Sequence, residues 1–119
     1  MIIFLYNVES GYGLDDIDLE LEEALTEFYE LSDEKGSFFG IKTDNGIIQF
    51  AWNGVDKWLL DLPNPPSFLN PQRYANYDES VEIIKSIFKG VLPENIDGLV
   101  KVKIMEETLD NVLEKNKNN

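Results

Sequence analysis

A turn-forming dipeptide, Asn45-Gly46, separates two runs of β-forming residues. Asn-Gly is the preferred pair in the two-residue turns that close β-hairpins. With the turn at these residues, Ile41 lies opposite Phe50, and the larger apolar side chains of both strands fall on one face. That face would carry Phe39, Ile41, Ile48, Phe50 and Trp52. The sequence therefore predicts an antiparallel hairpin with one face in a hydrophobic core.

A third strand is predicted over residues 57–62, after a turn at residues 53–56. A two-residue loop would point Trp58 away from the core face of the hairpin. A loop of three or five residues brings Trp58, Leu60 and Leu62 onto that face, so we expect one of these two lengths. Both Trp52 and Trp58 are then core residues rather than exposed binding residues.

The N-terminal part of the chain predicts a strand over residues 2–8 and then an acidic helix. From Asp16 to Leu31 the apolar residues recur at helical spacing. Four glutamates line the opposite side of this helix: Glu20, Glu23, Glu27 and Glu30. Three aspartates, Asp15, Asp16 and Asp18, would lie at its N-terminal end, where the helix dipole favours negative charge. Residues 17–21 also alternate, which leaves open a strand there and a later helix start.

The stretch from Pro63 to Tyr77 contains four prolines and is predicted to be a long loop. Its larger side chains are of types found at protein interfaces, although they could equally pack down on the sheet. They are Phe68, Arg73, Tyr74 and Tyr77. A helix over 78–89, a strand over 100–104 and a short helix over 106–114 follow. Residues 115–119 are expected to form a disordered polar tail.

These elements predict a single α+β domain over residues 1–114. We expect an antiparallel β-meander sheet of about four or five strands, with helices packed on one face.

The charge of the chain is strongly acidic and unevenly distributed. The formal net charge is −13, and the first 34 residues contain eleven acids and no Lys or Arg. Phosphate backbones are repelled by such a surface, which argues against direct binding of nucleic acid. A basic protein partner would be attracted to it, although acidity also simply keeps proteins soluble.

The residue types that the chain lacks narrow its chemistry. It contains no His and no Cys, so the usual general base, nucleophile triads and zinc ligands are missing. We therefore expect no enzymatic activity, no metal and no cofactor. No secretory signal or membrane-spanning apolar run is recognisable, and we expect a cytoplasmic protein that does not bind membranes.

Three stretches, Ser37–Ile41, Asn45–Trp52 and Trp58–Pro63, resemble immunity proteins of bacterial polymorphic-toxin and contact-dependent inhibition systems. The acidic N-terminal helix, central meander and following helix are similar too. The resemblance implies tight, non-covalent neutralisation of one cognate toxin, often a basic nuclease.

Our leading hypothesis is therefore an acidic immunity protein that binds a basic toxin. Its partner-binding residues would be Asp15, Asp16, Glu20, Glu23, Glu27, Glu30, Phe68, Arg73, Tyr74 and Tyr77. The alternative is a housekeeping assembly module that forms a homo-oligomer through the sheet or the proline-rich loop. The sequence leaves open whether the chain is a monomer or a homodimer.

Overall fold

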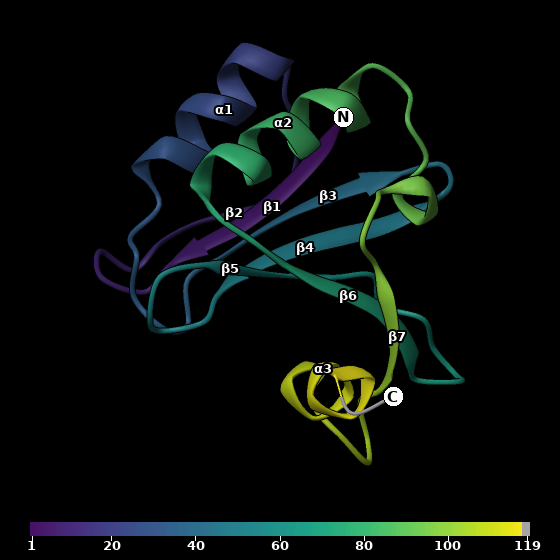
Figure 1. Cartoon of the computed structure of the whole chain (residues 1–119). Coiled ribbons are helices and arrows are strands. Elements are labelled where there is room, and N and C mark those ends of the chain that lie inside the picture. The colour runs from purple at the N-terminus through teal and green to yellow at the C-terminus, as the bar shows by residue number, and fades with distance from the viewer. Residues whose placement is uncertain (118–119) are drawn as a thin grey trace.

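In the computed structural model, which describes residues 1–117, the strands form one antiparallel sheet (Figure 1). The elements in chain order are β1 (Ile2–Asn7), β2 (Tyr12–Asp18), α1 (Leu21–Glu30), β3 (Phe38–Thr43), β4 (Gly46–Trp52), β5 (Trp58–Asp61), β6 (Leu69–Ala75), α2 (Tyr77–Phe88), the short 3-10 helix η1 (Pro93–Asn95), β7 (Val100–Lys103) and α3 (Leu109–Lys117). The strand order in the sheet is β2-β1-β3-β4-β5-β6-β7. The α+β class is thus confirmed, but the sheet has seven strands rather than four or five.

The first additional strand is β2, in the region where the sequence favoured the start of a helix. Asp16 has a φ of +50°, which no right-handed helix contains. A bulge there lets Ile17 pair with Ile3 after Leu14 has paired with Leu5. The helix therefore begins only at Leu21. The alternative prediction, a strand in residues 17–21 followed by a later helix start, is confirmed for Ile17 and Asp18.

The second additional strand is β6, which occupies half of the predicted loop. Pro71 lies inside it, and its carbonyl accepts a hydrogen bond from the Leu62 amide at 3.0 Å. The N–H and C=O of a strand residue point to the same side. Pro71 lacks an N–H group, but at this position the N–H would point toward the end of β5 and away from β7. The β6–β7 ladder therefore loses no hydrogen bond. Of the predicted loop, residues 63–68 and Asn76 remain outside strands and helices.

The central hairpin is confirmed, but its register is shifted by two residues. Ile41 pairs with Ile48 and Phe39 with Phe50, so the turn consists of Asp44 and Asn45. Both primed turn types need a positive φ at the first central residue, and type I′ needs one at the second as well. Neither Asp44 nor Asn45 has a positive φ. Gly46 provides the positive φ of +127° one position later. Because the shift is even, each side chain stays on its predicted face.

The β4–β5 loop has five residues, one of the two predicted lengths, and it places Trp58 directly opposite Trp52. The core lies between this face of the sheet and the helices α1 and α2. Phe28 of α1 is fully buried. Its ring centroid lies 5.3 Å from that of Phe39, 5.8 Å from that of Phe50 and 5.0 Å from that of Trp58. Truncating such a side chain typically costs about 3–5 kcal/mol.

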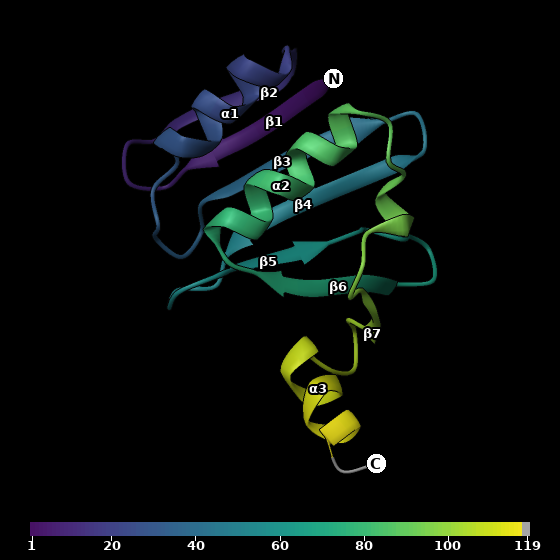
Figure 2. The same ribbon diagram turned by 45° about the horizontal axis from the view of Figure 1, so that its top comes forward.

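The sequence predicted that all helices pack on one face of the sheet, and this prediction is wrong for α3. Figures 1 and 2 both show α1 and α2 side by side on one side of the sheet, with α3 beyond β7. In Figure 1, α3 lies on the other side of the sheet, below β6 and β7. There Tyr74 donates a hydrogen bond to Asp110 at 2.8 Å. Helix α3 runs to Lys117, so residues 115–117 of the predicted tail are helical, whereas 118–119 lie outside the described residues.

Candidate functional site

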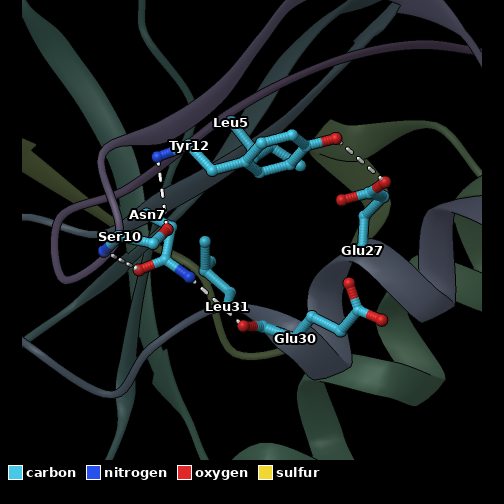
Figure 3. A pocket seen from close by; sticks show the side chains of 7 residues that line it. All are labelled: Leu5, Asn7, Ser10, Tyr12, Glu27, Glu30 and Leu31. Carbon is cyan, nitrogen blue, oxygen red and sulfur yellow. Dashed lines mark hydrogen bonds between the residues drawn. The ribbon is translucent and has the colours of Figure 1, made fainter.

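A pocket of about 300 Å³ opens between the β1–β2 hairpin and the C-terminal half of α1 (Figure 3). Its lining combines two carboxylates, one phenol, two small polar side chains and two leucines. These are Glu27, Glu30, Tyr12, Asn7, Ser10, Leu5 and Leu31. The pocket is formed by two segments, residues 5–12 and residues 27–31. Both belong to the first 34 residues, which contain no Lys or Arg.

Hydrogen bonds fix the walls of this pocket (Figure 3). The Tyr12 hydroxyl donates to Glu27 Oε1 at 3.3 Å, which links β2 to α1. Asn7 Nδ2 donates to the Glu30 carbonyl at 3.2 Å, at the end of the helix. The Ser10 amide donates to Asn7 Oδ1 at 3.4 Å, and Ser10 Oγ accepts from the Tyr12 amide at 3.2 Å. The hairpin turn and the helix end therefore form one connected unit.

The electrostatics at this end of α1 are negative and uncompensated. Desolvation and the nearby Glu27 and Glu30 carboxylates raise the pKa of Tyr12 above its ordinary value, so its hydroxyl stays a donor at neutral pH. The last turn of α1 has no basic residue, although the C-terminal end of a helix dipole is itself negative. Among residues 1–117, no ion pair involves Glu27 or Glu30.

Two further tyrosines flank the same helix end. Tyr29 of α1 and Tyr77 of α2 are 55% and 37% exposed, and their rings stack with centroids 5.8 Å apart. The Tyr77 hydroxyl donates to the Phe28 carbonyl at 3.3 Å. Burial and the adjacent Tyr29 raise the pKa of Tyr77. We call the group formed by Tyr12, Glu27, Tyr29, Glu30 and Tyr77 the acid–tyrosine surface.

The chemistry of this surface suits a cationic side chain. Carboxylates accept charge-assisted hydrogen bonds from Arg or Lys, and tyrosine faces attract cations through their ring quadrupole. Tyrosine also contributes a large contact area at a low entropic cost.

Of the predicted site residues, the structure brings Glu27 and Glu30 together in the pocket, whereas Tyr77 contacts Phe28 and Tyr29 of α1 and does not line it. Glu20 and Glu23 lie at the other end of α1, where Glu23 Oε1 accepts the Glu20 amide at 3.0 Å and caps the helix. This contact gives Glu23 a structural role.

The other predicted acids and loop residues are dispersed. Asp15 and Asp16 belong to β2 and not to the start of a helix, and Asp16 forms an ion pair with Lys42 at 2.7 Å. Arg73 and Tyr74 lie in β6, not in a loop, and Phe68 sits alone in the β5–β6 turn, 43% exposed.

Arg73 is committed to structural contacts. Its guanidinium donates to Glu79 Oε2 at 2.8 Å, to the Asp97 carbonyl at 2.9 Å and to the Tyr74 carbonyl at 2.9 Å. Arg73 therefore pairs with the Glu79 carboxylate and connects β6 to the first turn of α2.

Sequence reasoning missed Tyr12 and Tyr29. Tyr29 lies outside the apolar stripe of α1, between Glu27 and Glu30, and a large aromatic residue on the acidic face was a signal that could have found it. Tyr12 gave no such signal, because its position beside Glu27 depends on how the β1–β2 hairpin packs against the helix.

Comparison of the chain with protein-family models, with curated proteins and with solved structures finds no match. Within residues 1–117, no three acidic side chains converge into a group that could hold a metal ion. No helix in this described part of the chain is long and apolar enough to cross a membrane.

Proposed function

We propose that this chain is a non-enzymatic binding protein of the immunity type, which neutralises a basic protein toxin through its acid–tyrosine surface. One observation carries the proposal. Two glutamates without basic partners and three tyrosines surround the C-terminal end of α1, where the helix dipole adds to their negative charge.

The charge distribution supports a basic partner. All eleven acids of the first 34 residues belong to β1, β2, α1 or the segments that flank them. Ten of the eleven are exposed, and only Glu27 is half-buried. Such a one-signed surface raises the association rate of an oppositely charged protein and lowers that of nucleic acids.

The pocket and the tyrosines support tight binding after the encounter. A partner Arg or Lys that enters the pocket would meet Glu27, Glu30 and the Tyr12 ring at once. The exposed pair Tyr29 and Tyr77, between α1 and α2, would add aromatic contact area outside the pocket, of the kind found at interface hot spots. Slow dissociation follows from burying these groups together.

The position of the two glutamates also supports a functional role. Acids at the C-terminal end of a helix lower the stability of the folded chain, because they oppose the dipole. Residues that lower stability are retained where activity requires them. The resemblance to immunity proteins agrees with a toxin as the partner and with a cytoplasmic location.

An affinity pull-down from the source cell tests the proposal. The baits are the wild-type chain, the isosteric pair Glu27→Gln/Glu30→Gln, and the matched control pair Glu106→Gln/Glu114→Gln. The control acids are exposed and belong to the C-terminal region. We expect the wild type and the control to retain one basic protein whose toxicity the chain abolishes. The Glu27/Glu30 pair should associate about tenfold more slowly.

Salt provides the second criterion, since added salt screens exposed charges. The association rate of the wild type should fall steeply with ionic strength, and that of the Glu27/Glu30 pair should fall less. Equal rates for the three baits would exclude the acid–tyrosine surface as the binding site. Failure to recover any toxic protein that the chain inhibits would refute the immunity function itself.

A further inference from the structure

Within the described residues 1–117, the side of the sheet opposite α1 and α2 has helical cover only at its β6–β7 end, where α3 lies (Figure 1). Cross-strand pairing aligns one continuous row of side chains over five strands of this side. The row is Tyr6, Phe38, Ala51, Leu59 and Tyr74. We call the part from β1 to β5 the open face. A sheet face of this composition is normally buried against another layer.

Aromatic side chains of neighbouring strands pack against one another on the open face. The ring of Phe4 lies directly over Gly40 of the neighbouring strand, in the space that a Cβ at Gly40 would occupy. The centroid of the Phe38 ring is 6.2 Å from that of Phe4 and 6.2 Å from that of Tyr6. Three aromatic rings thus form one layer on β1 and β3, ready to pack against an apolar surface.

Two charged side chains of this face, Lys42 and Asp61, have hydrogen-bond partners within the chain. Lys42 bonds to Asp16 at 2.7 Å. Asp61 Oδ1 accepts Asn70 Nδ2 at 3.0 Å and Gln72 Nε2 at 2.7 Å. Covering the open face would therefore keep Lys42 and Asp61 hydrogen-bonded. Lys57, at the border of the face, has no ion pair among residues 1–117, and its Nζ lies 4.5 Å from the centroid of the Tyr74 ring. Unpaired buried charges are what most often forbid such an interface.

We infer that a second copy of this chain covers the open face, in a two-fold dimer with the two sheets face to face. The charge distribution favours this occupant over a basic protein. The acids of α1 lie on the far side of the sheet, so two copies would keep them roughly 30 Å apart, with each layer about 10 Å thick. That separation exceeds the screening length of about 8 Å at physiological salt, and repulsion is weak.

A two-fold axis that runs parallel to the central strand β4, between the two sheets, also separates the acidic ends. In each copy β2 forms one edge of the sheet, whereas β7 with α3 forms the other. The axis lays the β2 end of one copy against the α3 end of its partner. The α3 end carries Lys115 and Lys117, and residues 99–117 contain as many bases as acids. Both acid–tyrosine surfaces would face outward and stay free, so the dimer goes beyond the proposed function without competing with it.

Sedimentation equilibrium tests the dimer directly. Leu59→Arg places a charge in the row at the centre of the open face. Val91→Arg is the matched control, because Val91 follows α2 on the helix side and is 41% exposed. We expect the wild type and Val91→Arg to be dimers at micromolar concentration. Leu59→Arg should be a monomer with an unchanged circular dichroism spectrum.

A cross-linking experiment does not depend on the Arg variants folding. The natural chain contains no cysteine, so single Ala51→Cys and Val91→Cys variants each react at one site. With a short bis-maleimide reagent, Ala51→Cys should give a covalent dimer and Val91→Cys should not. A wild-type monomer at high micromolar concentration would overturn the inference. So would a dimer that cross-links through Val91→Cys instead of Ala51→Cys. Neither readout involves the basic partner, so failure here leaves the proposed function standing.

Discussion

At the scale of single residues, the contact between Gly40 and Phe4 shows why one position must be glycine. Gly40 pairs with Phe4 on the neighbouring strand, and the Phe4 ring folds over it. An aromatic ring that covers a strand glycine compensates for the side chain that the glycine lacks. The glycine is therefore required by a close approach and not by a turn.

Gly40→Ala should destabilise the chain by about 1–3 kcal/mol, because the new Cβ displaces the Phe4 ring. Urea unfolding followed by tryptophan fluorescence measures this change. The double variant Gly40→Ala/Phe4→Leu should lose less than the sum of the two single changes, since the smaller side chain makes room. A more stable Gly40→Ala chain would show that the ring does not need the space.

Tyr74 gives the chain a specific alkaline sensitivity. Burial and the hydrogen bond to Asp110 raise the pKa of Tyr74 to about 12. An unfolded tyrosine titrates near its ordinary value of about 10. The folded chain therefore holds this proton more tightly. The contribution to stability is full below pH 10 and is lost as the pH rises to about 12.

Tyr74→Phe removes this contribution at every pH. At neutral pH the variant should be less stable by about 1 kcal/mol, the usual value of a lost hydrogen bond. Its free energy of unfolding should fall less than that of the wild type between pH 10 and about 12. Urea unfolding at three pH values across this window measures both slopes, and parallel curves would contradict the assignment.

At the scale of elements, the two long helices differ in how well their ends are capped. Asn76 accepts the Glu79 amide at 2.8 Å at the start of α2, and Lys85 lies in the last turn of that helix. This is the charge order that the helix dipole favours. Helix α1 has acids in its first turn but ends in Glu30 with no base.

Glu30→Lys should therefore stabilise the folded chain by about 0.3–1 kcal/mol, because a positive charge at the C-terminal end complements the dipole. Chemical denaturation measures the gain. Glu106→Lys, outside any helix, is the control and should have little effect. If Glu30 contacts the basic partner, Glu30→Lys should also bind that partner more weakly. A Glu30→Lys chain that is less stable than the wild type would contradict the helix-dipole argument.

Local patterns predicted the elements whose signals lie within a few residues. The central hairpin, the burial of Trp58 and the apolar stripe of α1 belong to this class, since each depends on alternation or helical spacing. The strands β2 and β6 do not. Pro71 fits in β6 only because β5 ends beside it, and Asp16 forms a bulge only because β1 is its partner. These are properties of neighbours distant in sequence.

At the scale of the whole molecule, charge is separated across the sheet. The acid-rich residues 1–34 supply one edge and one helix, whereas residues 35–119 hold all ten bases. Repulsion within the acidic part lowers the stability of the folded state. The composition showed this asymmetry, but which acids meet the tyrosines depended on how α1 packs against β2 and α2.

The free energy of unfolding of the wild type should consequently rise as sodium chloride is added, because salt screens the repulsion. Chemical denaturation at several ionic strengths provides the slope. A Glu27→Lys/Glu30→Lys variant has less repulsion to screen, so its slope should be shallower. A stability that falls with salt would mean that the acids take part in favourable ion pairs.

The even register shift of the β3–β4 hairpin bears on how this fold can change in evolution. Its strand pairing differs by two residues from the register that Asn45-Gly46 indicated, and every side chain kept its face. Insertions or deletions of residue pairs at this hairpin would likewise preserve the buried set. Single-residue changes would turn one strand inside out unless a bulge absorbed them. Relatives of this chain should therefore differ in hairpin length mainly by even numbers.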